Sequence, residues 1–456
     1  MAVVDQPAAK VKVTNTTHVK PNKLIGKKEC QLVTFDLPYL AFYYNQKMII
    51  YKLGNSPSFD DLVEKLKDTL GVVLGDFYQL AGKLGKDEEG VFKVEYDDDV
   101  DGGGVEVVVA DAEQSIEVAD LMQQEEATSL FKELLPYNGV LNLEGLHKPL
   151  LAVQLTKLKD GLAMGCAFNH AILDGTSTWH FMNSWAEICR GSTTISVQPF
   201  LERTQARNTR VKLNLSKPSD APEHANSVKS NAVATPDLAP SLREKLFCFS
   251  ESAIDQIKSK VNANLVEGGS TKPFSTFQSL STHVWQAVTS ARQLKPEDYT
   301  VFTVFADCRK RVDPPMPESY FGNLIQAIFT VTSAGLLVGQ PPEFGAGVIQ
   351  KAIEMHDAKA IDARNTEWES NPKIFEYKDA GVNCVAVGSS PRFKVYDIDF
   401  GFAKPESVRS GCNNRFDGMV YLYPGKDGGR SIDVEISLEA NAMERLEKDR
   451  DFLMEA

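Results

Sequence analysis

The residue whose position most favours catalysis is His170, in the segment NHAILDG at residues 169–175. It follows an apolar run, LAMGCAF, and a histidine at the end of a strand is well placed to act as a general base. Its imidazole could take a proton from an alcohol or amine that attacks a carbonyl near pH 7. Asp174 could orient the ring, or hold the loop by pairing with a buried arginine. The pattern H-x-x-x-D alone is only weak evidence for catalysis, and a histidine after a strand more often has a structural role.

A covalent acyl-enzyme is less favoured than direct transfer. Cys166 precedes His170 by four residues, which at about 3.4 Å per residue of strand separates them by about 13 Å. No serine or cysteine nucleophile is paired locally with His170. The motifs G-x-S-x-G, Walker A, H-E-x-x-H and G-x-G-x-x-G do not occur. We therefore predict that the acceptor itself is the nucleophile.

The elements that must position His170 can be predicted from the residues around it. Alternation predicts strands at 149–158 and 162–168, joined by a Lys-Asp-Gly turn. A helix is expected from about 176 to 190, closed by Gly191 just beyond its end. The histidine would then lie in the loop between a buried strand and a helix.

The rest of the chain alternates predicted strands and helices, which indicates an α/β protein. The first half has a helix capped by Ser58 and strands at 91–96 and 105–109. The second half is expected to contain strands at 244–250, 299–307, 382–387 and 432–438, an apolar segment at 321–332, and helices at 252–260, 277–292 and 344–363.

The composition changes between residues 198 and 241, where Ser, Pro, Asn, Ala and charged residues dominate. A stretch of about forty such residues is too long for an ordinary loop and is typical of a linker. We predict an N-terminal domain at 1–197, a crossover linker at 198–241 and a C-terminal domain at 242–456.

The 456 residues carry 49 Lys and Arg against 62 Asp and Glu, a formal net charge of −13. This balance argues against nucleic acid as the main partner, although a local basic patch can still hold a small anion. Seven scattered cysteines without a CxxC pair favour a reduced, cytosolic setting without disulfides or a metal site. The start has no signal-peptide core, and the apolar run from Leu324 is too interrupted to span a membrane.

Two motifs together identify a family. NHAILDG, followed by DFGFAKPE from Asp399, resembles the plant BAHD acyltransferases, whose signatures are H-x-x-x-D-G and D-F-G-W-G. Segments at 77–84, 307–311 and 320–323 also look like this family, and the likeness covers essentially the whole chain. Stretches such as FDLPYLAFYYNQK are similar to a subgroup that acts in cutin formation.

The resemblance implies a fold and a mechanism. The fold is two chloramphenicol-acetyltransferase-like α/β domains of mixed sheet flanked by helices, with a channel between them. Acyl-CoA is the co-substrate, with no permanently bound cofactor, and enters from one face while the acceptor enters from the other. His170 deprotonates the acceptor hydroxyl, which attacks the thioester, and the tetrahedral intermediate expels CoA thiolate. We also expect a cytosolic monomer without an integral membrane segment.

The resemblance also assigns roles to residues outside the histidine loop. It implies that Asp174 pairs with Arg309, the alternative being that Arg309 and Arg311 meet CoA phosphates. Asp399, Phe400 and Gly401 are implied to be structural. The sequence departs from the family at Phe402 and Ala403, where Trp and Gly are usual, so an indole N–H is absent.

Ligand contacts are the least determined part of the site. The cationic candidates for CoA are Lys272, Arg309, Lys310, Arg311 and Arg392, and the segment from 269–271 to Ser275 and Thr276 offers hydroxyls at a helix N-terminus. The plain alternative for that segment is a capped helix start. Phe402 and Arg392 are candidates for substrate binding; Arg392 could meet an acidic acceptor or be a surface residue.

Three functional hypotheses follow. The first is an O-acyltransferase that uses a hydroxy fatty acyl or lipid acceptor in cutin biosynthesis. The second keeps the chemistry but uses a phenolic, alcohol or polyamine acceptor in specialised metabolism. The third is a non-catalytic scaffolding or ligand-binding protein. A carrier-dependent condensation domain is disfavoured because Asn169 replaces the first histidine of its H-H-x-x-x-D-G motif.

Overall fold

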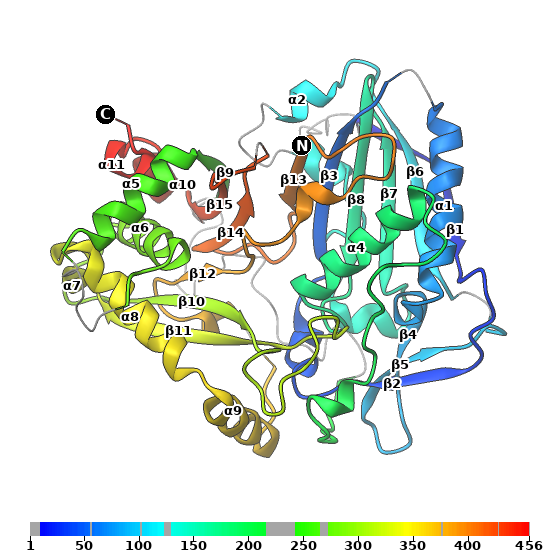
Figure 1. Cartoon of the computed structure of the whole chain (residues 1–456), viewed down its shortest axis with the longest axis horizontal. Coiled ribbons are helices and arrows are strands. Elements are labelled where there is room, and N and C mark those ends of the chain that lie inside the picture. Colours follow the sequence, from blue (N-terminus) through cyan, green and yellow to red (C-terminus); the bar gives the residue numbers. More distant parts are fainter. Residues whose placement is uncertain are drawn as a thin grey trace, which may run out of the picture.

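The structure, a computed structural model, describes residues 10–54, 57–100, 103–122, 129–215, 242–264, 272–374, 377–426 and 428–455. Two six-stranded sheets form the centres of its two halves, and a small three-stranded sheet lies beside the first (Figure 1). Both large sheets are mixed, because β6 runs parallel to β7 in the first and β12 runs parallel to both neighbours in the second. The expected fold class, two mixed sheets flanked by helices, is therefore confirmed.

The strands can be given in their spatial order. The first sheet contains β1 (Val11–Val19), β6 (Val105–Ala112), β7 (Leu151–Lys157), β8 (Gly161–Phe168), β3 (Asn45–Lys52) and β13 (Ser407–Ser410). The second contains β11 (Ile325–Ser333), β10 (Tyr299–Asp307), β12 (Val385–Val387), β14 (Met419–Pro424), β15 (Ile432–Glu439) and β9 (Leu242–Phe249). The small sheet contains β2 (Lys28–Gln31), β5 (Phe92–Tyr96) and β4 (Lys83–Lys86).

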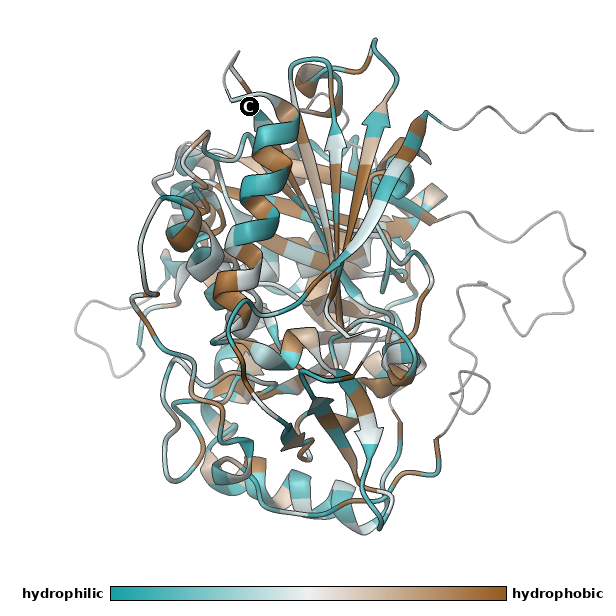
Figure 2. Ribbon diagram, turned by 90° about the vertical axis from the view of Figure 1, so that its right-hand side faces the viewer, coloured by the Kyte–Doolittle hydropathy of each residue, from teal (hydrophilic) through white to brown (hydrophobic). Residues whose placement is uncertain are grey.

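Helices cover each sheet. The first half carries α1 (Phe59–Leu74), α2 (Val118–Met122), α3 (Ser129–Glu133) and α4 (Gly175–Cys189), and the second carries α5 (Glu251–Asn262), α6 (Thr276–Ala291), α7 (Ala334–Gly339), α8 (Pro342–Met355), α9 (Ala358–Ser370), α10 (Ala440–Leu446) and α11 (Arg450–Leu453). Short 3-10 turns include η1 (Leu37–Ala41) and η3 (Asn142–Leu146). Hydrophobic residues follow the central strands, whereas α1 alternates between hydrophobic and hydrophilic residues (Figure 2). That alternation is expected of a helix with one buried face.

The length predicted for one helix of the second half is wrong. The expected helix at 344–363 is two helices, α8 and α9, which are separated by His356 and Asp357. The side chain of Asp357 accepts a hydrogen bond of 2.9 Å from the backbone N–H of Ala360 and so begins a new helix.

One strand from the second half of the chain belongs to the first sheet. β13 pairs antiparallel with β3, from Ser407 opposite Ile50 to Ser410 opposite Lys47. The chain thus passes from the second sheet at β12 to the first at β13 and back at β14. Arg409 of β13 also forms a buried ion pair with Glu435 of β15, at 2.5 Å, which ties the two sheets together.

The predicted domain boundaries stay a prediction, and much of the linker, residues 216–241, lies outside the described residues. The described part of the linker pairs with other segments of the chain. Phe200 forms a β-bridge with Tyr320, and Lys212 forms one with Val91. In the described chain no helix is both long and apolar enough to cross a membrane. The apolar run from Leu324 forms β11 and α7 instead.

Candidate active site

His170 follows β8, a strand in which all eight residues are buried. Asparagines from both halves of the chain hold its backbone. The N–H of His170 donates to Oδ1 of Asn142 at 2.9 Å, and its carbonyl accepts from Nδ2 of Asn323 at 2.9 Å. Asn169 donates in turn to the carbonyl of Asn142 at 2.8 Å. The histidine is therefore fixed between the two sheets by hydrogen bonds that leave its ring available.

The imidazole of His170 stacks on the ring of Tyr39, with centroids 4.6 Å apart and planes 7° from parallel. Its Nδ1 is buried and forms no hydrogen bond with another residue. Burial lowers the pKa of His170 below its ordinary value, because the charged imidazolium is poorly solvated there. The ring is consequently neutral near pH 7, which is the state that a general base requires.

Asp174 does not touch the imidazole but fixes the loop that carries it. The side chain is fully buried and forms two hydrogen bonds with the Arg309 guanidinium, at 2.9 and 3.0 Å. It also accepts from the backbone N–H groups of Ser177 and Leu324, each at 3.0 Å. Burial alone would raise the pKa of Asp174, but Arg309 and these N–H groups outweigh it and hold the pKa below its usual value. Of the two roles open to Asp174, the structure shows the arginine pair.

The start of α4 needs a glycine. A Cβ on Gly175 would lie 2.7 Å from Cζ of Phe393, which approaches from the loop that follows β12. Phe393 also packs on Trp179 of α4, with ring centroids 6.5 Å apart. The final glycine of NHAILDG therefore permits close contact with the second half of the chain.

A second buried ion pair supports the loop from the other side. Arg203, from the crossover segment, lies 3.1 Å from Asp36 and donates to the carbonyl of Ile172 at 2.6 Å. Asp36 accepts in turn from the backbone and side chain of Asn323, both at 3.1 Å. Sequence reasoning missed these residues, since a lone arginine in a polar stretch carries no local sign of burial. Asn323 stood in a family-like segment, which was the one available signal.

The segment Asp399–Gly401 serves the core of the first half. Phe400 is fully buried, 5.0 Å from the Trp185 ring, and Gly401 adopts φ +88° with its N–H donating to Asp399. These placements agree with the structural role implied for the motif. Phe402 stacks on Phe400, with centroids 5.9 Å apart, and contacts Tyr51. Its half-buried ring therefore packs against the core, and its binding of substrate stays a prediction.

Most of the predicted CoA ligands have other partners. Arg309 is committed to Asp174, which removes it from the phosphate-binding candidates. Arg311 donates to the carbonyls of Ile353 and His356 at 2.9 and 3.0 Å, at the end of α8. Ser275 caps α6 by accepting from the N–H of Gln278, so the capped-helix alternative holds there.

The remaining candidates are not gathered around the histidine. Lys310 pairs with Glu318 at the surface. Lys272 and Arg392 are exposed and Thr276 is half-buried, and residues 269–271 lie outside the described residues. Nothing brings Lys272, Thr276 or Arg392 into contact with His170, so their ligand roles stay predictions. Among the described residues, no three His, Cys, Asp or Glu side chains could together hold a metal ion.

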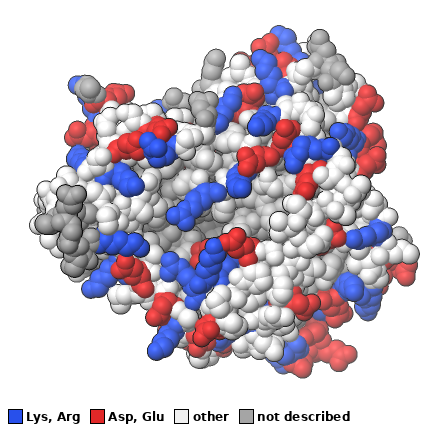
Figure 3. Space-filling model, in the orientation of Figure 1, with Lys and Arg blue, Asp and Glu red and all other residues white. Residues whose placement is uncertain are grey.

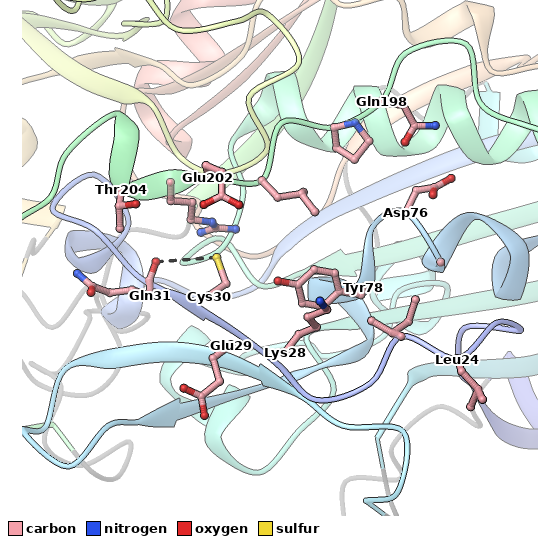
Figure 4. A pocket seen from close by; sticks show the side chains of 15 residues that line it. Leu24, Lys28, Glu29, Cys30, Gln31, Asp76, Tyr78, Gln198, Glu202 and Thr204 are labelled. Carbon is pink, nitrogen blue, oxygen red and sulfur yellow. Dashed lines mark hydrogen bonds between the residues drawn. The ribbon is translucent and has the colours of Figure 1, made fainter.

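Two hollows differ in their relation to His170. A cavity of about 220 Å³ lies between the halves, and Tyr39, whose ring stacks on His170, forms part of its wall. A larger hollow of about 600 Å³ is lined only by the first half and the start of the crossover (Figure 4). Three acids, Glu29, Asp76 and Glu202, and two basic residues, Lys28 and Arg203, line that larger hollow.

Known proteins resemble this chain over almost its whole length. The model of the Transferase family matches residues 9–453. The chain is 65% identical over 454 residues to "BAHD acyltransferase DCR" of Arabidopsis thaliana, covering 98% of this chain and 93% of that protein. It is 31% identical to a hydroxycinnamoyl-CoA:5-hydroxyanthranilate N-hydroxycinnamoyltransferase of Avena sativa, covering 87% of each chain.

Solved structures share the fold at lower identity. Vinorine synthase matches with a TM-score of 0.71 and 20% identity, covering 97% of this chain and 98% of the other. TRI101 of F. graminearum, complexed with coenzyme A and deoxynivalenol, matches with a TM-score of 0.72 and 20% identity, covering 94% and 99%.

Proposed function

Because this chain belongs to the BAHD acyltransferases of the Transferase family, we propose that it transfers an acyl group from a CoA thioester to the hydroxyl of a hydroxy fatty acyl or lipid acceptor in cutin biosynthesis. The acyltransferase class follows from the family. The hydroxyl acceptor and the cutin role are proposals, supported by the resemblance to the cuticular subgroup and by the apolar cavity beside the histidine.

The observation that carries the mechanism is the neutral His170 ring, clamped at the end of β8 with Nδ1 enclosed. Nε2 is then the nitrogen that meets the acceptor and takes the hydroxyl proton. The acceptor oxygen attacks the thioester carbon, and the tetrahedral intermediate breaks its C–S bond. The departing thiolate of CoA recovers the proton from the imidazolium, so the histidine returns neutral.

Direct attack is favoured over a covalent intermediate. Cys166 is a fully buried residue of β8, and burial raises the pKa of its thiol to about 12. A thiolate would therefore be rare near pH 7. Asp174 and Arg309 act as positioning residues, because they hold the loop without touching the ring.

Acyl-CoA is proposed as the diffusible co-substrate. Lysine and arginine side chains border the hollow in the middle of the face in Figure 3, and aspartate and glutamate side chains lie beside it as well. A local group of basic side chains can attract a polyanion even in a protein of net charge −13. Lys272 and Thr276 remain proposed contacts, and cytosolic location and a monomeric state remain proposals from the sequence.

The test is release of coenzyme A by the purified protein and by His170→Ala. With an ω-hydroxy fatty acid as acceptor, we expect the variant to lose roughly 10²- to 10⁴-fold in rate, the range typical of a general base. Mass spectrometry across acyl donors and across hydroxy fatty acids, glycerolipids and phenolic acids identifies the product. Equal release by both proteins would refute the role of His170, and preference for a phenolic acid or polyamine would refute the cutin assignment.

A further inference from the structure

The cavity beside the active histidine is mostly apolar. Both halves of the chain contribute to it, and its aromatic wall contains Phe35, Tyr39, Phe42, Phe305, Phe329 and Trp368. Tyr39 gives the cavity a fixed relation to the chemistry, because the same ring stacks on the imidazole of His170. His170 itself does not line the cavity, so Tyr39 is the residue that connects the cavity wall to the base.

One cation in the wall lacks an anionic partner. Arg364 of α9 is half-buried, and its guanidinium lies over the Phe329 ring, 5.1 Å from the centroid. It donates to the carbonyl of Ala327. Within the described chain, no carboxylate forms an ion pair with it.

Arg311 and Arg445 are also half-buried and donate to backbone carbonyls without a carboxylate partner in the described chain, whereas the more deeply buried arginines differ. The four that are fully buried each have a carboxylate: Arg203 with Asp36, Arg309 with Asp174, and Arg409 and Arg415 with Glu435. A cation that is partly withdrawn from water without a counter-ion can meet an anion in a ligand. Burial lowers the pKa of Arg364, which agrees with the missing counter-ion.

The cavity wall also contains a buried hydrogen-bond acceptor without a partner. Gln326 lines the same cavity and is 9% exposed. Its Nε2 donates to Asn365 at 2.9 Å, while its Oε1 is buried without a partner. An oxygen left in this way can accept a hydrogen bond from a hydroxyl of a bound molecule. The cavity thus combines an apolar wall with two cations, Arg364 and Lys373, one acid, Asp379, and a buried acceptor oxygen on Gln326.

We propose that this cavity binds the acceptor as a free hydroxy acid, with its carboxylate on Arg364, its apolar body along the aromatic wall and its reacting hydroxyl at His170. The proposal rests on the proposed function and narrows its acceptor to an acid rather than an ester or glycerolipid. It also moves the anion-binding role that the sequence suggested for Arg392 to a different residue, because Arg392 is exposed and Arg364 lines the cavity.

The test compares 16-hydroxyhexadecanoic acid with its methyl ester, using the wild-type protein, Arg364→Gln and Arg364→Lys. We expect the wild-type KM to be about 10- to 100-fold lower for the acid than for the ester, as a charged hydrogen bond in a buried site implies. R364Q should abolish this difference by raising the KM of the acid alone, and R364K should restore part of it. Lys359→Gln is the matched control, since it removes an exposed positive charge from the same helix.

A binding measurement keeps this inference separate from catalysis. Trp368 lines the cavity, so its fluorescence should report binding of the hydroxy acid without acyl-CoA. If the wild-type protein acylates no acceptor, the proposed function fails, while tighter binding of acid than ester, lost in R364Q, would still support the cavity assignment. Equal KM and equal binding for acid and ester would overturn it. So would an R364Q variant whose only change is a higher KM for acyl-CoA, because the anion would then be a CoA phosphate.

Discussion

Removing the charge of Asp174 should destabilise the protein more than removing any surface carboxylate. In Asp174→Asn the N-cap of α4 is kept, because asparagine is also a good cap, but the Arg309 guanidinium loses its buried counter-ion. Arg309 is 2% exposed, and its other carboxylate, Asp307, lies 3.2 Å away and is 45% exposed. Breaking a buried pair from one side costs about 3–5 kcal/mol.

The matched control is Asp307→Asn, which removes the exposed partner of the same guanidinium. Solvent screens the charge of Asp307, which is 45% exposed, so this variant should lose much less stability than D174N. The assay is urea unfolding followed by circular dichroism, together with kcat/KM for each protein. Similar losses of stability in the two variants, or no loss in either, would refute the view that Asp174 and Arg309 are a buried positioning pair.

The same measurement has a defined dependence on pH. The pKa of Asp174 is held below its usual value of 3.8, so the stabilisation is fully present above that value. It is lost as the pH falls through the lower pKa of the folded state. The difference between the wild type and D174N should therefore be constant near neutral pH and shrink in acid.

Two further outcomes are expected. Burial lowers the pKa of His170, so the apparent pKa on the acid side of a plot of kcat/KM against pH should lie below the ordinary histidine value of 6.5. An apparent pKa above that value would contradict a desolvated general base. Arg311→Ala should lower the melting temperature, because Arg311 caps α8 through the carbonyls of Ile353 and His356. The KM for acyl-CoA should stay unchanged. A raised KM without loss of stability would instead make Arg311 a CoA ligand.

The strand before His170 and the helix after it could be predicted from the sequence, because neighbouring residues determine both. The apolar run before His170 and the helix after Gly175 both carry periodic patterns, and they form β8 and α4 with ends within a residue or two of those expected. The partner of Asp174 came only from the family resemblance, since nothing in the spacing selects Arg309.

The supports of the histidine could not be predicted in the same way. Asn142 and Asn323 lie far from His170 in the chain, and an amide side chain has no sequence pattern that marks it as a backbone clamp. The surroundings of Arg311 could not be predicted for a related reason. Charge alone selected Arg311, but a guanidinium satisfies a helix end as readily as a phosphate, and only the position of α8 decides between them.

The fold was missed where strands are short or depend on distant partners. The strands β1, β2, β3, β4, β13 and β14 were not predicted. The four residues of β13 pair with β3, more than three hundred residues earlier. The break between α8 and α9 was missed because helical periodicity continues across it, although Asp357 was an available N-cap signal.

The placement of β13 has a consequence for how the protein is made. A ribosome has synthesised almost nine-tenths of the 456 residues before this strand exists, and until then β3 is an edge with unpaired N–H and C=O groups. An N-terminal fragment that stops at the linker would keep that edge permanently and should aggregate. Two separately expressed halves would be expected to become soluble only when they are produced together.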